Sequence, residues 1–309
     1  MRAVLVVNPA ATTTSDAVRD VIAAALSSSL DLDVIHTTSR NDAVDIARQA
    51  ATDSVDVLLA LGGDGTVNEL ANGLMSKGPC LDGPVLAAIP GGNANVFTRN
   101  MGFPADPVEA TARILDSIEQ QRFQTVGVGK VETPELERYF LFNSGIGLDA
   151  AVLARMEQRR TRGKSASDAS YAALALNELF LKTDRRHPSL TITDSHGQAL
   201  TDAHLALIVN IAPWSYLGAR PLNPTPQANL NTALDVYAPT RLSGLGVARL
   251  ARSILRSVAE PRDVITLHDQ PHVHFASERP MWVQVDGEAL GQTTSMHVTH
   301  IPDALKVMV

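Results

Sequence analysis

A glycine-rich turn, GGDGT at residues 62–66, interrupts an apolar run between a predicted strand and a predicted helix. Glycines at such a point let the backbone approach a ligand closely, and the amides that start a helix suit an anionic group. Asp64 would repel a bare phosphate, so a cation or a hydroxyl partner is expected, for example the Mg²⁺ of a nucleotide. The alternative is a strand–helix turn without a ligand.

A second glycine turn, PGGNAN at residues 90–95, also follows a predicted strand and opens a predicted helix. Asn93 and Asn95 in this turn can donate and accept hydrogen bonds. The first predicted strand ends in Asn8 and Pro9. Because ligands of an open parallel sheet bind outside the carboxyl ends of its strands, these three strand ends predict one crevice. No lysine follows the glycines, so neither turn has the phosphate-binding Walker A spacing.

Two carboxylates stand close together near the end of the chain, in VDGE at residues 285–288. Asp286 and Glu288 would share one face of a continuous strand, although Gly287 could bend the chain. A carboxylate beside an alcohol can accept its proton during a transfer reaction. The alternative is a surface β-turn with two solvated carboxylates.

The elements that must position these residues alternate in the first part of the chain. Short apolar strands and amphipathic helices follow one another up to about residue 121, which predicts a parallel α/β sheet. The expected strands are 4–7, 32–37, 55–61 and 84–90, and the expected helices are 15–30, 41–51, 66–75, 93–101 and 106–120.

The pattern changes in residues 122–300, where runs of strands predict a β-rich sandwich domain. The expected strands are 123–132, 138–147, 188–194, 203–212, 233–238, 263–269, 271–277 and 281–288, with helices at about 149–183 and 243–258. We expect residues 301–309 to form a further strand that could return to the first domain. Trp214 and Tyr216 fall in a predicted loop, where they either pack or form a hydrophobic lip for a substrate.

Composition excludes several functional classes. The chain has 309 residues, 45% of them hydrophobic, and a formal net charge of −7, which gives no basis for nucleic-acid binding through overall charge. The single cysteine, Cys80, excludes disulfide scaffolds and cysteine-based zinc sites. His272 and His274 could share a strand face, but no accompanying ligand set is apparent, so no metal ligands are predicted. No leader or transmembrane segment is visible, so we expect a cytoplasmic protein that could act peripherally at the inner membrane surface.

Four motifs occur in a fixed order: GGDGTVNE at 62–69, PGGNAN at 90–95, NSGIGLDA at 143–150 and VDGE at 285–288. Together they resemble the diacylglycerol kinase catalytic-domain family, which includes bacterial lipid kinases and sphingosine kinases. GGDGT alone is less specific, because NAD kinases and phosphofructokinases share it. The resemblance covers nearly the whole chain. It implies an α/β ATP-binding domain, a C-terminal β-sandwich and an active site in the cleft between them.

The resemblance also implies an activity: phosphorylation of a lipid hydroxyl, such as that of diacylglycerol, by Mg²⁺-ATP. It makes Glu288 the general base and places Asp64 near the phosphates and their Mg²⁺. A lipid at the membrane surface would be the partner, and the sequence leaves a homodimer open. The residues implied to bind ATP are Asn8, Pro9, Thr37, Gly62, Gly63, Asp64, Gly65, Thr66, Val67, Asn68, Gly91, Gly92, Asn93, Asn95 and Gly287.

The chain departs from the family pattern in three places. The first motif reads NPAATTTS instead of continuing into a Ser-Gly or Gly-Lys-like turn. Asn93 and Val96 stand where Thr and Asp are usual. Asn231 and Thr232 stand near the place of an Asp-Gly pair that can hold a structural Mg²⁺ in bacterial members. Because an amide is a weaker Mg²⁺ ligand than a carboxylate, no metal site is predicted there.

Two competing functions remain open at the level of sequence. An NAD kinase would share GGDGT and a two-domain plan, but PGGNAN and VDGE argue against it. A non-catalytic nucleotide- or lipid-binding module of the same fold would not need Asp64 and Glu288, yet the altered first motif leaves it open.

Overall fold

The computed structural model describes residues 1–9, 15–161, 187–243, 247, 249–250, 252–254 and 263–309. The chain divides into two units, residues 1–128 with 301–309 and residues 129–300. The domain boundary was expected after residue 121. The observed division falls after residue 128, within strand β5 (Phe123–Glu132), which contributes residues to both units. None of the described helices is long and apolar enough to cross a membrane.

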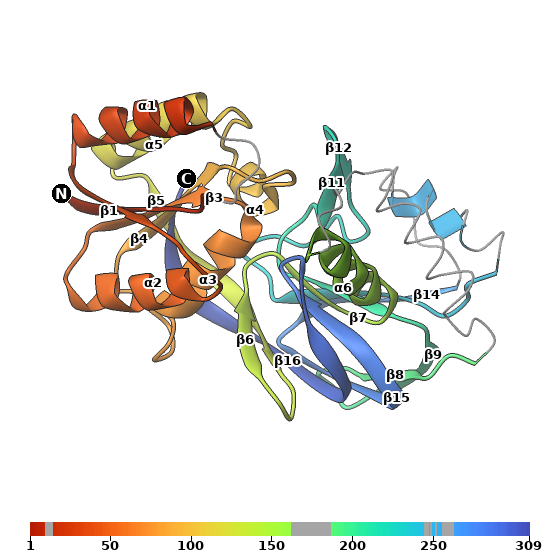
Figure 1. Ribbon diagram of the computed structural model, residues 1–309. Coiled ribbons are helices and arrows are strands. Elements are labelled where there is room, and N and C mark those ends of the chain that lie inside the picture. Colours follow the sequence, from red (N-terminus) through yellow and green to blue (C-terminus); the bar gives the residue numbers. More distant parts are fainter. Residues whose placement is uncertain (10–14, 162–186, 244–246, 248, 251, 255–262) are drawn as a thin grey trace. The chain divides into compact units, whose positions relative to one another are not determined.

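Unit 1 is the expected α/β domain, with a parallel sheet in the order β4-β3-β1-β2. Figure 1 shows α1 and α5 on one face of this sheet and α2 and α3 on the other. The strands are β1 (Arg2–Val7), β2 (Asp31–His36), β3 (Val57–Gly62) and β4 (Val85–Pro90). The helices are α1 (Asp16–Ser27), α2 (Asp42–Thr52), α3 (Asp64–Leu74), α4 (Val96–Asn100) and α5 (Pro107–Glu119).

Central position explains the continuous apolar sequence of β3. All six of its residues are buried, as expected for a parallel strand covered on both faces. The edge strand β2 has mostly exposed residues. On the other side, the end of β16 (Glu288–Met308) lies parallel to β4, with Val307 opposite Leu86.

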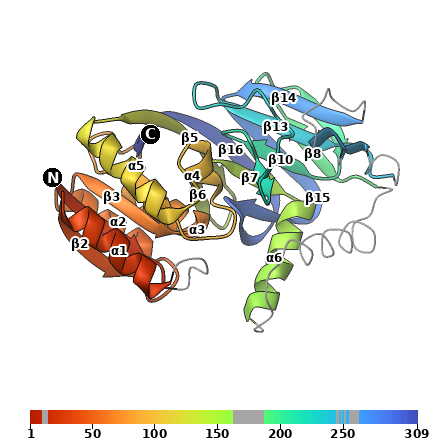
Figure 2. The ribbon, with the colours of Figure 1, turned by 90° about the horizontal axis from the view of Figure 1, so that it is seen from above.

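Unit 2 is β-rich and mainly antiparallel, as Figure 2 shows. Its elements are β6 (Glu137–Phe140), β7 (Asn143–Ile146), α6 (Leu148–Thr161), β8 (Leu190–Thr193), β9 (Ala199–Ala203), β10 (Ala206–Val209), β11 (Ser215–Leu217), β12 (Arg220–Leu222), β13 (Leu234–Pro239), β14 (Val264–Gln270) and β15 (His272–Val285). The long strand β15 pairs with β8 along its first half and with β7 along its second. The strands enclose a large apolar core, and Leu205, Leu207 and Tyr237 form a second, smaller cluster.

Four sequence expectations in unit 2 need correction or lie partly outside the described residues. The strand expected at 138–147 is split into β6 and β7. Tyr216, expected in a loop, lies in the β11–β12 hairpin, whereas Trp214 precedes that hairpin. The helix expected to continue to residue 183 is described only to Thr161, and most of the helix expected at 243–258 lies outside the described part of the chain.

Candidate active site

The two glycine turns of unit 1 pack directly against each other. The Gly91 amide donates to the Gly62 carbonyl at 2.8 Å. A Cβ added to Gly91 would lie 3.0 Å from the Gly62 Cα, and one added to Gly92 would lie 2.7 Å from the Gly63 Cα. The sequence suggested that these glycines make room for a ligand. In the structure, the neighbouring turn lies beside Gly63, Gly91 and Gly92, and a Cβ added to Gly62 would meet the Thr66 Oγ1 at 2.6 Å. These glycines therefore allow the two turns to pack closely.

The Asp64 side chain ties the same two turns together. Its two carboxylate oxygens accept hydrogen bonds from the amides of Val96 and Phe97, each at 3.0 Å. The carboxylate therefore caps the start of α4, although it belongs to the first residue of α3. Burial raises the pKa of the Asp64 carboxyl, and the two amides and the Arg99 guanidinium counteract that rise.

The start of α3 keeps two amides available. The Thr66 and Val67 amides donate to the Gly63 carbonyl, at 3.0 and 3.3 Å. Within the described part of the chain, the Asp64 and Gly65 amides donate to no protein acceptor. Gly65 is exposed, and a Cβ added to it would meet no atom within 4 Å. Two unpaired amides at the positive end of a helix, beside open space, can bind an anionic oxygen.

The remaining strand ends lie at this same edge of unit 1. The Asn8 amide donates to the Leu61 carbonyl at 3.0 Å, and the Asn8 Nδ2 donates to the Thr66 Oγ1 at 3.1 Å. The Thr37 amide donates to the Val7 carbonyl at 2.9 Å. Asn8 and Thr37 are therefore fixed at the carboxyl ends of β1 and β2, beside the end of β3. Pro9 is exposed next to Asn8.

Several residues predicted to bind ATP have side chains that are used inside the unit. Val67 and Asn68 are each 2% exposed, and the Asn68 Oδ1 accepts a hydrogen bond from Asn72. Asn95 folds back onto Gly92 through two hydrogen bonds of 2.9 and 2.6 Å. By contrast, Asn93 is exposed. The buried side chains shape the two turns, whereas Gly65, Asn93 and Pro9 have exposed positions at the edge.

The VDGE segment in unit 2 is a tight hairpin turn between β15 and β16. Val285 pairs with Glu288, and Asp286 and Gly287 have φ values of 44° and 82°. Two central residues with positive φ form the type I′ turn for which Asp-Gly is favoured. Gly287 is exposed and has open space around it, so its observed role is to allow the turn.

Asp286 is not the solvated turn carboxylate of the simpler sequence interpretation. It is 3% exposed and accepts hydrogen bonds from the amides of Leu141, Phe142 and Asn143, at 2.8, 3.0 and 3.0 Å. These three amides lie where β6 ends and β7 begins. The carboxylate therefore explains why the strand expected at 138–147 is interrupted.

Glu288 is the first residue of β16 and is partly exposed. Its Oε2 lies 3.4 Å from the Arg138 Nη2 of β6, and its side chain is 23% exposed. Behind it, the Gln284 Oε1 accepts a hydrogen bond from the Gly287 amide at 3.0 Å, and the Gln284 Nε2 donates to the Asn143 Oδ1 at 2.8 Å. Sequence reasoning assigned no role to Arg138 or Gln284. Asn143 lies in the NSGIGLDA motif, and that motif was the sequence signal that could have pointed to it.

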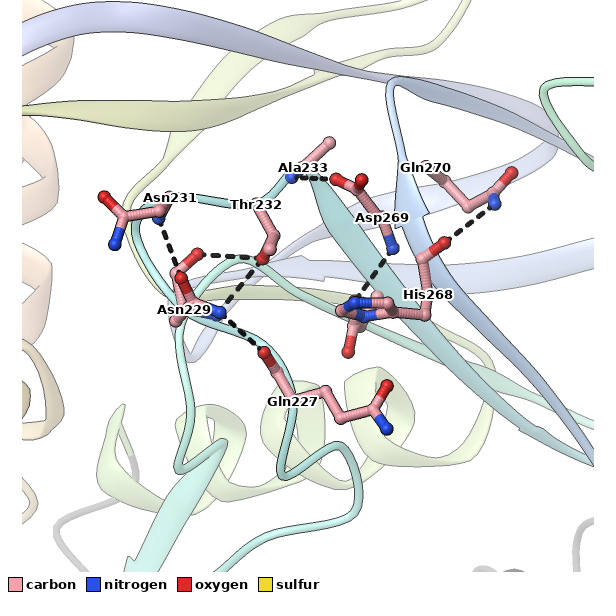
Figure 3. A network of polar contacts seen from close by, with 9 residues as sticks. Gln227, Asn229, Asn231, Thr232, Ala233, His268, Asp269 and Gln270 are labelled. Carbon is pink, nitrogen blue, oxygen red and sulfur yellow. Dashed lines mark hydrogen bonds and ion pairs between the residues drawn. The ribbon is translucent and has the colours of Figure 1, made fainter.

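The segment around Asn231 forms a network of polar contacts (Figure 3). The Asn231 amide donates to the Asn229 Oδ1 at 3.0 Å, and the Ala233 amide donates to the Asp269 Oδ1 at 2.7 Å. Asp235, which is buried, lies 2.7 Å from the His268 Nδ1. Among the described residues, no three His, Cys, Asp or Glu side chains are arranged to hold a metal ion.

The segment that contains the two glycine turns is similar to a known protein family. The model of the diacylglycerol kinase catalytic domain matches residues 2–131, which include both glycine turns. This part of the chain is therefore similar to the diacylglycerol kinase catalytic-domain family. A Stenotrophomonas maltophilia protein described as a YegS-like lipid kinase is 26% identical over 95% of this chain and 91% of its own length.

A further relative and two solved structures are also similar to the chain. The Bacillus subtilis diacylglycerol kinase is 34% identical over 36% of this chain, and the match spans only 33% of that protein. A diacylglycerol kinase structure from Bacillus anthracis has a TM-score of 0.72 at 23% identity, covering 99% of this chain and 96% of that one. An Archaeoglobus fulgidus NAD kinase solved with ATP has a TM-score of 0.53 at 11% identity, covering 100% and 94%. These two structures show the fold.

Proposed function

We propose that the chain is a lipid kinase that transfers the γ-phosphoryl group of Mg²⁺-ATP to a lipid hydroxyl, with diacylglycerol as the acceptor to test first. The observation that carries this proposal is the pair of unpaired amides at the start of α3, held beside the second glycine turn. The family match and the diacylglycerol and lipid kinases among its relatives support a kinase that acts on lipid.

The nucleotide part of the proposal rests on unit 1. Phosphoryl transfer needs positioning and neutralisation of charge more than covalent chemistry. The Asp64 and Gly65 amides and the α3 dipole would bind the phosphate oxygens. Asn8, Thr37 and Asn93 follow strands of the same sheet and would line the same edge of unit 1. The NAD kinase in the comparison was solved with ATP, which supports the choice of nucleotide.

A magnesium ion would fit the donor set at Asp64. Each carboxylate oxygen has about two lone-pair sites, and each accepts one amide hydrogen bond in the structure. One acceptor site per oxygen is therefore left for a hard cation. When bound with the nucleotide, Mg²⁺ would neutralise phosphate charge. Asp64 would then have two roles, as the cap of α4 and as a metal ligand.

Glu288 is proposed as the general base. Its carboxylate would accept the proton of the lipid hydroxyl while that oxygen forms a bond to the γ-phosphorus. The bond from the γ-phosphorus to the bridging oxygen would break, and its electron pair would leave with ADP. The Asp286 anchor and the Arg138 ion pair would keep the Glu288 carboxylate in place during this step.

The decisive experiment is transfer of label from γ-labelled ATP to a panel of lipids in detergent micelles, with NAD as a competing acceptor. Labelled phosphatidic acid from diacylglycerol would support the proposal in full. Label on another lipid alcohol would support the lipid kinase activity but with an acceptor other than diacylglycerol. Label on NAD with none on any lipid would reject it in favour of an NAD kinase-like activity, and no transfer at all would favour a binding module.

A further inference from the structure

We infer that the β11–β12 hairpin, residues 215–222, is the part of unit 2 that inserts into the surface of an anionic phospholipid bilayer. This inference rests on the proposed lipid kinase function and assigns the surface through which the enzyme meets its acceptor. Figure 1 shows the hairpin as a separate two-stranded element in unit 2.

The hairpin exposes apolar residues at its end. Leu217 is 49% exposed, one of the largest values among the exposed large hydrophobic side chains, and Gly218, Ala219 and Pro221 are exposed beside it. Tyr216 of β11 is partly buried, and Trp214, before the hairpin, packs against the buried cluster of Leu205, Leu207 and Tyr237. An exposed aliphatic tip with a tyrosine behind it has the chemistry of an interfacial anchor, because a tyrosine ring lies favourably where hydrocarbon meets headgroups.

The charge of the surrounding sequence fits an anionic bilayer. No Asp or Glu occurs between Asp202 and Asp235, although the chain has 33 acidic residues and a net charge of −7. Arg220, the fourth residue after Tyr216, is exposed on β12. A hairpin within a sequence stretch that lacks carboxylates and carries an exposed arginine can approach lipid phosphates, which acidic segments would repel. This local contrast favours a membrane over a basic protein partner.

The hairpin is also connected to the turn that holds the proposed base. The Trp214 carbonyl, which precedes β11, accepts a hydrogen bond from the Asn143 Nδ2 at 2.9 Å. The Asn143 Oδ1 accepts one from the Gln284 Nε2 at 2.8 Å, and the Gln284 Oε1 accepts one from the Gly287 amide at 3.0 Å. Gly287 is the neighbour of Glu288. Anchoring the hairpin in a bilayer would therefore hold the Glu288 turn at a fixed distance from the lipid surface.

Co-sedimentation with vesicles tests the inference without any need for catalysis. The wild-type chain and the variants Leu217→Asp, Arg220→Gln and Leu81→Asp would be mixed with phosphatidylcholine vesicles that contain or lack phosphatidylglycerol. Leu81 is a matched control, because it is an exposed leucine (37%) in unit 1. Circular dichroism and thermal denaturation of each variant would show that it is folded.

We expect Leu217→Asp to weaken binding to phosphatidylglycerol vesicles by roughly tenfold or more, because it removes an apolar contact and adds a repelled charge. Arg220→Gln should weaken binding about fivefold at low salt, and less at high salt. Leu81→Asp should bind as the wild type does. Equal binding by Leu217→Asp and Leu81→Asp, or no binding by the wild type to either vesicle, would overturn the inference.

A second measurement separates this inference from the proposed function. A short-chain, water-soluble diacylglycerol should be phosphorylated equally by the wild type and Leu217→Asp, whereas diacylglycerol in vesicles should be phosphorylated more slowly by the variant. If Leu217→Asp lost vesicle binding and the wild type phosphorylated no lipid, the hairpin would still be the membrane-binding surface, and the proposed kinase function would be rejected. Unchanged activity of Leu217→Asp on vesicles would keep the kinase and reject the membrane surface.

Discussion

Gly92 lies so close to Gly63 that a side chain on Gly92 would place its Cβ 2.7 Å from the Gly63 Cα. We therefore expect Gly92→Ala to lower the free energy of unfolding by about 1–3 kcal/mol, since one of the two turns must move. Gly65→Ala is the matched control, because its Cβ would meet no atom within 4 Å. Urea denaturation compares the two. Equal stability of the two variants would show that the turns do not depend on this contact.

Gly65→Ala should instead affect nucleotide binding. The added methyl group would project into the open space beside the unpaired Asp64 and Gly65 amides, where the phosphates are proposed to bind. We expect ATP affinity to fall about tenfold, which is about 1.4 kcal/mol, with little change in stability. Isothermal titration with ATP measures this effect. Unchanged affinity would place the phosphates elsewhere in unit 1.

Asp64→Asn should lower the free energy of unfolding of unit 1, whether or not the residue also acts in catalysis. Asparagine keeps one acceptor oxygen, but its amide nitrogen would face a backbone amide that needs an acceptor. Leaving that donor unsatisfied costs about 1–3 kcal/mol. Asp116→Asn, on the exposed face of α5, is the control. If Asp64→Asn were as stable as this control and bound ATP normally, both the cap and the nucleotide role of Asp64 would be rejected.

Glu288→Gln should lower kcat for lipid phosphorylation by about 10²–10⁴-fold, the range for loss of a general base. The glutamine keeps the size of the side chain, so ATP affinity and thermal stability should change little. Glu278→Gln, an exposed residue of β15, is the control. Steady-state kinetics with a saturating acceptor separates kcat from KM. A near-normal kcat would exclude Glu288 as the base.

His297 should make unit 2 less stable in mild acid. The pKa of His297 is lowered, first by burial and then by His274, while Glu132 opposes the change. Rings of His272 and His274 lie 6.1 and 6.0 Å from the His297 ring, measured between centroids.

Because the native pKa lies below that of the unfolded chain, the unfolded state binds more protons, and stability falls as pH drops below about 6.5. Denaturation at about pH 7.5 and pH 5.5 should therefore show a smaller difference for His297→Gln than for the wild type. The same pH difference in both proteins would rule out this cause.

Much of the architecture could be predicted because it depends on local patterns. The apolar run at β3 and the helical spacing around it led directly to the parallel sheet of unit 1. A strand was expected through residues 281–288, with a turn only as the alternative, whereas the Asp-Gly pair at 286–287 forms a hairpin turn. What could not be predicted were contacts between distant residues. Nothing near Asp286 in the sequence shows that its carboxylate binds amides at 141–143.

The same limit affected the candidate site. From the sequence, ligand access is the expected reason for Gly62, Gly63, Gly91 and Gly92, and that role stays a prediction. Their close approach became visible only when both turns were placed side by side. Likewise, the spacing of Asp64 from Val96 gave no sign that its carboxylate caps α4, because a cap from another segment leaves no local pattern.

The position of residues 301–309 has a consequence for the order in which the protein folds. The Cys80 amide donates to the Ala304 carbonyl at 2.7 Å, and the Ser117 Oγ donates to the Val309 carbonyl at 2.7 Å. On the ribosome, residues 1–128 emerge first, yet the strand that covers the free edge of β4 follows the whole of unit 2. During synthesis, the β4 edge of unit 1 therefore stays unpaired and apolar until residues 301–309 have been made. Such an edge is a site for aggregation or chaperone binding.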